Sequence, residues 1–212
     1  MSEARLHAVT LPGAGGMRLC ADIAGPADGQ PVVLMHGGGQ TRHAWRRAVL
    51  ALAAEGWRAI ALDARGHGDS AWAADGDYGV DAMCADLRAV VATLARPPVL
   101  VGASMGGITA LVAAADAPGL ARAVVLVDVV PRLEFEGVRR IIDFMTARPD
   151  GYASLDEAAE AVAAYNPGRQ RSPDTQGLAK NLRQGADGRW RWHWDPRFMA
   201  VGEQEQAARV HA

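Results

Sequence analysis

The sequence predicts an α/β fold in which a mostly parallel sheet is flanked by helices. Short apolar runs rich in β-branched residues alternate with segments whose apolar residues recur every three or four positions. This alternation is typical of successive β-α units, in which the strands run parallel. It stops after residue 131, so we assign residues 1–131 to the sheet-containing core and residues 132–212 to a helical lid. The strands predicted for the core are residues 32–35, 59–62, 99–101 and 124–127.

The composition indicates a globular protein whose partner is a small molecule. Half of the 212 residues are hydrophobic, which is enough for a substantial core. The net charge is −2 and the charged residues are interspersed, so we predict no surface for nucleic acid or for a membrane. Cys20 and Cys84 lack the spacing of a zinc site or a disulfide framework, and no metal or organic cofactor is expected. The first residues lack the layout of a secretion signal, which favours a cytoplasmic location.

The first elements are an antiparallel hairpin and two amphipathic helices. Residues 5–11 and 17–24 flank a stretch rich in glycine, and we expect them to pair at the edge of the sheet. Each of the next two strands is followed by apolar residues at helical spacing, which give one buried stripe per helix. These residues are Trp45, Ala48, Val49 and Leu52 in the first helix, and Val80, Met83, Cys84, Leu87, Val90, Val91 and Leu94 in the second.

Residues 97–115 contain no charged side chain, a length that by itself would suggest a transmembrane helix. Glycines at positions 102, 106 and 107 argue against a membrane span. We interpret the segment as a strand buried on both faces, followed by a helix buried on the sheet.

The predicted lid is mainly helical. Val138, Ile141, Ile142 and Met145 share one helix face. A second helix is expected from Ser154, because the pattern Ser-Leu-Asp-Glu has the form of a capping box. A short helix through Leu178 and Leu182, the aromatic run 190–194 and a polar helix over 202–212 complete the predicted elements.

Ser104 is the candidate nucleophile. It lies in the sequence Gly-Ala-Ser-Met-Gly-Gly, residues 102–107, between an apolar strand and a helix rich in small residues. A serine on so sharp a turn has strained backbone angles, and the flanking glycines avoid collisions with the neighbouring strand and helix. Such a turn holds the hydroxyl outward. The alternative is an ordinary glycine-rich turn between a strand and a helix.

A second glycine motif follows the first core strand and supplies a candidate oxyanion hole. Residues 36–40 read His-Gly-Gly-Gly-Gln, and glycines there let a backbone amide approach a substrate oxygen. We predict that the amides of Gly38 and Met105 together stabilise the oxyanion that forms when Ser104 attacks a carbonyl. The alternative is a flexible loop between strand and helix.

Three motifs together resemble those of the α/β-hydrolase superfamily. They are HGGG at residues 36–39, DARGHGDS at 63–70 and GASMGG at 102–107, and their order and separation also match. The resemblance covers about residues 6–131, and the helical part beyond is similar to the lid of the epoxide-hydrolase and haloperoxidase-like branch. The resemblance implies that Ser104 is the nucleophile. Epoxide hydrolases of that branch carry aspartate there, so a serine implies acyl-transfer hydrolysis of an ester, lactone, amide or activated carbon–carbon bond.

The resemblance also implies an acid after the sixth or seventh strand and a general-base histidine after the eighth. The predicted strands end earlier, so we expect a truncated chain that lacks the last core strands, on the order of 60 to 80 residues. An open sheet edge at residues 124–127 would then allow self-association. Asp128 follows that strand, where some relatives carry the acid, and its alternative role is to cap a turn.

The histidines within the chain are weaker candidates for the base. The family uses the positions of His36 and His67 to support the turns in which they lie. His193 lies between two tryptophans and has two interpretations. It either lies over Ser104 or belongs to an aromatic packing patch.

The sequence therefore predicts a serine hydrolase of a small, rather apolar, ester-like substrate, acting through an acyl-serine intermediate. We expect poor turnover without the base, since the serine hydroxyl then stays protonated. Two alternatives are a non-catalytic ligand-binding protein on the same fold and a cofactor-free haloperoxidase or perhydrolase.

Overall fold

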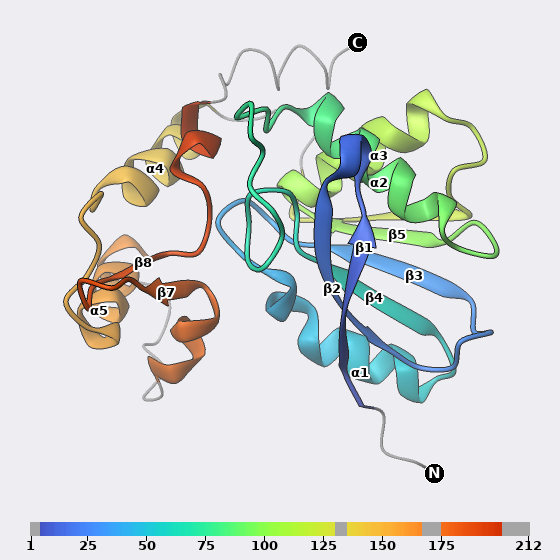
Figure 1. Cartoon of the computed structure of the whole chain (residues 1–212), viewed down its shortest axis with the longest axis horizontal. Helices are drawn as coiled ribbons and strands as arrows, with labels where there is room; N and C mark the ends of the chain where they lie inside the picture. The colour runs from blue at the N-terminus through green and yellow to red at the C-terminus, as the bar shows by residue number, and fades with distance from the viewer. Residues whose placement is uncertain (1–4, 130–134, 167–174, 201–212) are drawn as a thin grey trace. The chain divides into compact units, whose positions relative to one another are not determined.

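The computed structural model describes residues 5–129, 135–166 and 175–200, and its main feature is a six-stranded sheet (Figure 1). The strand order is β1-β2-β4-β3-β5-β6. The first two strands form the predicted hairpin, which pairs antiparallel with β4, and the remaining strands are parallel. The strands are β1 (His7–Pro12), β2 (Arg18–Ala24), β3 (Pro31–Met35), β4 (Arg58–Leu62), β5 (Val99–Ala103) and β6 (Ala123–Val127).

Helices cover both faces of the sheet, which confirms the predicted α/β class. Helix α1 (Arg46–Ala54) lies on one face, whereas α2 (Val80–Ala92) and α3 (Met105–Asp116) lie on the other (Figure 1). Alternate residues of the central strands therefore point to different helices, and both sets are apolar because both faces are buried. The cluster beneath α1 contains Ala24, Val32, Leu34, Val49, Ala53, Ala59 and Ala61.

The uncharged stretch 97–115 forms β5 and α3, as expected for a buried strand and helix. None of the helices in the described part of the chain is long and apolar enough to cross a membrane.

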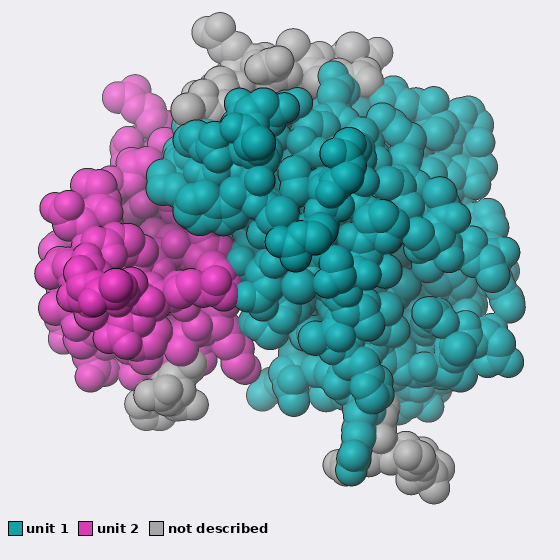
Figure 2. All heavy atoms as spheres, viewed as in Figure 1, with its two compact units in different colours: residues 1–131, 195–212 teal, residues 132–194 magenta. Residues whose placement is uncertain are grey.

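The chain divides into two compact units (Figure 2). The first contains residues 1–131 and 195–212, and the second contains residues 132–194. The first boundary coincides with the predicted one. The second boundary, at residue 194, differs from the predicted division, in which the lid extends from residue 132 to residue 212. The described residues beyond 194 include the 3₁₀ helix η4 (Pro196–Ala200), which belongs to the core unit.

The second unit contains a hairpin that the sequence analysis missed. The predicted helix through Leu182 is instead the 3₁₀ helix η3 (Thr175–Lys180) followed by β7 (Leu182–Gln184). This strand pairs antiparallel with β8 (Trp190–Trp192), because the intervening turn brings an alternating Trp-Arg-Trp segment alongside it. Tyr152, Ala158 and Leu182 form the core of the unit.

Two helices of the second unit match their predicted positions. They are α4 (Phe135–Thr146) and α5 (Leu155–Tyr165). The capping box is present, since Ser154 Oγ accepts a hydrogen bond of 3.1 Å from the Glu157 amide and the Glu157 carboxylate accepts one from the Ala153 amide. The polar helix expected at residues 202–212 lies outside the described residues.

Strand β6 is the outermost strand on its side of the sheet within the described residues, and its apolar side chains are exposed. Val125, Leu126 and Val127 are 46%, 41% and 41% exposed. Because an apolar edge strand offers unpaired backbone groups to another chain, we predict self-association. Light scattering should show an apparent mass that rises with concentration, and Leu126→Lys should reduce the rise. A constant monomer mass would contradict this prediction.

Candidate active site

Ser104 lies on the tight turn between β5 and α3, and its side chain is exposed. Its φ is 45° and its ψ is −116°, a conformation that L-residues rarely adopt. Its amide donates to the carbonyl of Val127 (3.1 Å), and its carbonyl accepts from the Ile108 amide (2.9 Å). The hydroxyl does not cap the helix and has no partner among the described residues. The strained backbone is therefore held on both sides while the hydroxyl projects outward.

The glycines around Ser104 are required by close packing. A Cβ on Gly102 would lie 2.3 Å from the carbonyl oxygen of Gly106, and a Cβ on Gly106 would lie 2.6 Å from the carbonyl oxygen of Met35. Both collisions are with backbone, which cannot move as a flexible side chain can. The strand-turn-helix geometry inferred from the sequence thus has a direct steric cause.

We predict that Gly106→Ala destabilises the protein by about 1 to 3 kcal/mol, the usual effect of overpacking. Gly137→Ala is the matched control: Gly137 also lies in a helix, α4, and a Cβ there would meet no atom within 4 Å. It should be neutral or stabilising, since alanine favours helices more than glycine does. Urea unfolding of both variants measures this. Equal effects of the two substitutions would contradict the steric account.

The predicted oxyanion loop lies beside the serine turn because β3 and β5 are neighbours. Met35, at the end of β3, is in register with Gly102. The chain leaves β3 toward β4 on one side and leaves β5 toward β6 on the other, so the two loops diverge at this point of the sheet. Ligands of open α/β sheets bind at such a point. A Cβ on Gly37 would lie 3.5 Å from the Cβ of Ser104, which places the loop against the nucleophile.

The three successive glycine amides of this loop differ in their hydrogen bonding. The Gly37 amide donates to Gln40 Oε1 (3.2 Å), and the Gly39 amide donates to His67 Nε2 (3.3 Å). Within the described residues the Gly38 amide has no protein acceptor, and neither does the amide of Met105, the first residue of α3. These two are the amides that the sequence analysis selected as oxyanion donors.

His36 and His67 connect the loops around the site. Both rings are buried. His36 Nδ1 donates to the Gly37 carbonyl (2.8 Å), since its Nε2 accepts from the Ala64 amide (3.1 Å). His67 is held in the same way. Its Nε2 accepts a hydrogen bond from the Gly39 amide, and its Nδ1 therefore donates to the Arg65 carbonyl. All four ring nitrogens are thus engaged by backbone, which agrees with the supporting role expected from the resemblance.

Burial lowers the pKa of His36 to about 4, although its hydrogen bond to Gly37 acts in the opposite direction. The ring is therefore neutral at pH 7 and can accept the Ala64 amide proton. His193, the other histidine considered as a base, belongs to the second unit, where its amide donates to Asn181 O (2.9 Å).

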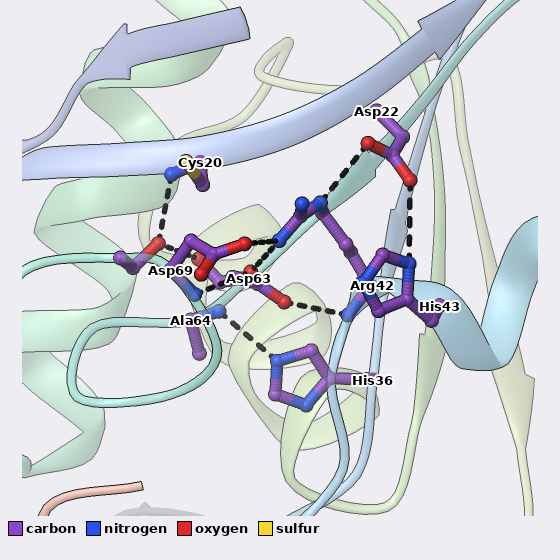
Figure 3. Close-up of polar contacts among 9 residues, drawn as sticks. Cys20, Asp22, His36, Arg42, His43, Asp63, Ala64 and Asp69 are labelled. Atoms are coloured by element: carbon purple, nitrogen blue, oxygen red, sulfur yellow. Dashed lines mark hydrogen bonds and ion pairs between the residues drawn. The ribbon is translucent and has the colours of Figure 1, made fainter. Parts of the chain in front are cut away.

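A buried arginine ties the loop after β4 to the start of η2 (Arg42–Trp45) (Figure 3). Arg42 donates to Asp22 (3.0 Å), to Asp63 and to Asp69 (2.8 Å), and its amide donates to Asp63 Oδ1 (2.6 Å). His43 lies 3.5 Å from Asp22 on the other side. Burial alone would lower the pKa of Arg42, but the carboxylates, Asp63 foremost, outweigh burial and raise it.

The loop after β4 carries three charged residues, Asp63, Arg65 and Asp69, whose hydrogen bonds lie partly within the loop and partly beyond it. Asp63 does bond within its loop, through the Asp69 amide (3.0 Å). Arg65, however, reaches α2, where it donates to both oxygens of Asp86 (2.7 and 2.9 Å). The hydrogen bonds to Asp86 are the largest cause that raises the pKa of Arg65.

Asp128 lies beside the serine turn but shows no catalytic partner. It follows Val127, which is in register with Ala103, and its own φ is 53°. The side chain is exposed, and the structure pairs no histidine with it among the described residues. Its role as the acid remains a prediction.

Four residues near the site were missed by the sequence analysis. The Tyr78 hydroxyl bonds the buried Asp195 carboxylate, which also accepts from Arg197 Nη2 (2.6 Å). The Asp195 amide donates to Gly66 O (2.8 Å), so η4 is attached to the loop after β4. Phe198 then packs edge-on against His67, with ring centroids 4.7 Å apart. No local pattern signals these contacts, because the tyrosine and the aspartate are 117 positions apart.

Comparison with known proteins identifies the family of the chain and several relatives. Residues 30–206 match a family described as alpha/beta hydrolase fold. An esterase from Mycobacterium tuberculosis is 34% identical over 170 residues, which cover 77% of this chain and 56% of the esterase. A non-heme chloroperoxidase from Burkholderia pyrrocinia is 35% identical over 195 residues, which cover 86% of this chain and 69% of the relative.

Solved structures show the same architecture. An α/β hydrolase from Novosphingobium aromaticivorans superposes with a TM-score of 0.80 and 25% identity, over 96% of this chain and 72% of that chain. The present chain spans about half the length of the first curated relatives that it matches, from 42% to 56%.

Proposed function

This chain belongs to the α/β-hydrolase fold family, and from that premise we propose that Ser104 is the nucleophile of a hydrolase acting on small, rather apolar esters. The observation that carries the proposal is the turn itself. The backbone of Ser104 is strained and fixed, and its hydroxyl is exposed and unbonded within the described residues. Over the same residues, two amides lack an acceptor: that of Met105, the next residue, and that of Gly38, in the loop whose Gly37 lies against Ser104. Strain of this kind persists only where the surrounding structure enforces it.

The proposed reaction has two steps. Ser104 Oγ attacks the carbonyl carbon and passes its proton to a base, and the carbonyl oxygen becomes an oxyanion that accepts hydrogen bonds from the Gly38 and Met105 amides. The carbon–oxygen bond to the alcohol then breaks, and the alcohol leaves with a proton. Water hydrolyses the resulting acyl-serine and releases the acid. No metal and no organic cofactor takes part.

The base is not among the buried histidines of the core, since both ring nitrogens of His36 and of His67 are engaged by backbone. Turnover without a base would be slow, because the serine hydroxyl then stays protonated. Oxyanion stabilisation alone still leaves part of the rate enhancement in serine hydrolases from which the base has been removed. Asp128, next to the turn, is the proposed partner of a base histidine.

Covalent labelling tests the proposal. Prolonged incubation with an alkyl fluorophosphonate should give one adduct, because the serine oxygen attacks phosphorus and displaces fluoride, slowly where no base takes up the serine proton. Intact mass and peptide mapping should place it on Ser104. Ser104→Ala should remove the adduct, whereas Ser154→Ala, which changes a serine in the lid capping box, should leave it in place. Labelling that persists in Ser104→Ala, or no labelling of the wild type, would refute the assignment.

A second candidate function is perhydrolysis, which the similarity to the chloroperoxidase favours. In that reaction hydrogen peroxide and acetic acid give peracetic acid and water, through the same acyl-serine. The two activities are distinguished by measuring peracetic acid formation from acetate against hydrolysis of an acetate ester. We further propose that the second unit serves as a lid. We also propose a cytoplasmic location for the protein.

A further inference from the structure

We propose that Phe198 forms the wall of the substrate subsite beside the oxyanion hole and limits the size of the group that the substrate carries next to its reacting carbonyl. This inference rests on the proposed function. It concerns a residue that follows the lid in sequence but belongs to the core unit.

Phe198 lies directly against the oxyanion loop. A Cβ built on Gly38 would be 3.5 Å from Cζ and 3.6 Å from Cε1 of the phenyl ring, which is ordinary van der Waals contact. Met105 packs against the same apolar cluster as Phe198. The ring therefore adjoins Gly38, and Met105 packs against the cluster to which the ring belongs. A substrate whose carbonyl oxygen reaches the amides of these two residues brings its neighbouring substituent to this ring.

The ring is held in place by aromatic neighbours. Its centroid is 4.7 Å from that of His67 and 6.3 Å from that of Tyr78, and both contacts are edge-on. His67 is itself fixed, since its Nε2 accepts the Gly39 amide at 3.3 Å. The phenyl group is 9% exposed. A displaced ring would lose contacts with the loop that carries the oxyanion donor.

An ion-pair clamp fixes the backbone that carries Phe198. The Asp195 side chain is 2% exposed, and its carboxylate accepts hydrogen bonds from Tyr78 and from Arg197. Burial alone would raise the pKa of Asp195, but the hydrogen bonds from Arg197 and Tyr78 outweigh burial and lower it. The Phe198 amide donates to the Asp195 carbonyl (2.9 Å), which joins the clamp to the ring.

The clamp also includes the end of the connection between β4 and α2. Arg197 Nη2 donates to Ala73 O (2.7 Å), and the Tyr78 hydroxyl accepts from the Ala73 amide (3.0 Å). The wall is thus set before any substrate binds. A preorganised wall of this kind discriminates between substrates by size rather than closing around each of them.

Two fluorophosphonates that differ only in the alkyl group on phosphorus, methyl and octyl, test the inference. The rate constant for modification of Ser104 is measured by intact mass for each probe, and the octyl-to-methyl ratio is compared between variants. Phe198→Ala should raise this ratio about tenfold, the scale at which pocket size discriminates between substrates. Met199→Ala is the control, since Met199 packs against the same cluster and is not among the atoms that contact Gly38. It should leave the ratio unchanged.

The outcomes separate the two proposals. If neither probe modifies Ser104 in the wild type, the proposed function fails and this inference fails with it. If both probes modify Ser104 but the ratio in Phe198→Ala stays within about twofold of the wild type, well short of that tenfold, the wall assignment alone is overturned. Phe198→Leu keeps most of the apolar volume. Its ratio should lie between those of the wild type and Phe198→Ala, and it provides the test if the alanine variant does not fold.

Discussion

Replacing Arg42 by leucine should lower the free energy of unfolding by about 3 to 5 kcal/mol at pH 7, the cost of removing one partner from a buried charge cluster. The Arg42 side chain is 7% exposed and Asp63 is 0% exposed. Without the guanidinium, the Asp63 carboxylate keeps its bonds from the Arg42 and Asp69 amides but loses the cation with which it is paired. Asp22 keeps its contact with His43.

The matched control is Arg88→Leu in the same unit. Arg88 pairs with Asp116 at 4.0 Å, and the two side chains are 38% and 33% exposed. Such surface pairs contribute at most about 1 kcal/mol. Urea denaturation of both variants measures the difference. A loss no larger than that of the control would show that the cluster is not a structural centre.

The second large effect concerns the stability of the protein between pH 6.5 and pH 4. The pKa of His36 is lowered from 6.5 to about 4 by burial. As the pH falls through 6.5 the unfolded chain takes up a proton on this residue, whereas the folded chain does so only near pH 4. The stability that the neutral ring provides is therefore complete above pH 6.5 and is lost on acidification, by roughly 3 kcal/mol in total.

His36→Gln isolates this contribution, because it removes the titrating ring while all carboxylates remain. The variant should be less stable than the wild type at pH 7, since the bond to the Ala64 amide is altered. The difference should narrow steadily toward pH 4, measured by urea unfolding at intervals of pH. A difference that stays constant over this range would contradict the assignment of a neutral, buried imidazole.

The sequence was sufficient for the parts of the molecule that local pattern determines. Residues 32–35, 59–62, 99–101 and 124–127 all lie within observed strands, because β-branched runs between helical stripes leave few alternatives. The serine turn was also predictable. A side chain at Gly102 would collide with backbone only a few residues away, and a side chain at Gly106 would collide with the adjacent strand. Glycine is therefore required at both positions.

The contacts that hold the loops together were not predictable. Arg42 stands in an unremarkable Thr-Arg-His-Ala segment, and its partner Asp22 comes from the antiparallel hairpin. The Tyr78–Asp195 bond depends on where the chain returns after the second unit. Such pairs form only when distant parts of the chain pack together. The spacing of apolar residues along a helix or strand does not indicate which of these parts will meet. The Trp-Arg-Trp run was interpreted as an aromatic patch, although its alternation is that of a strand.

The central claim is that the Ser104 hydroxyl faces the free amides of Gly38 and Met105. A crystal structure of the phosphonylated protein measures this directly, because the phosphoryl oxygen occupies the position of the oxyanion. We predict that this oxygen lies about 2.7 to 3.1 Å from both amide nitrogens. An adduct on Ser104 whose phosphoryl oxygen points to solvent, or contacts neither amide, would contradict the account.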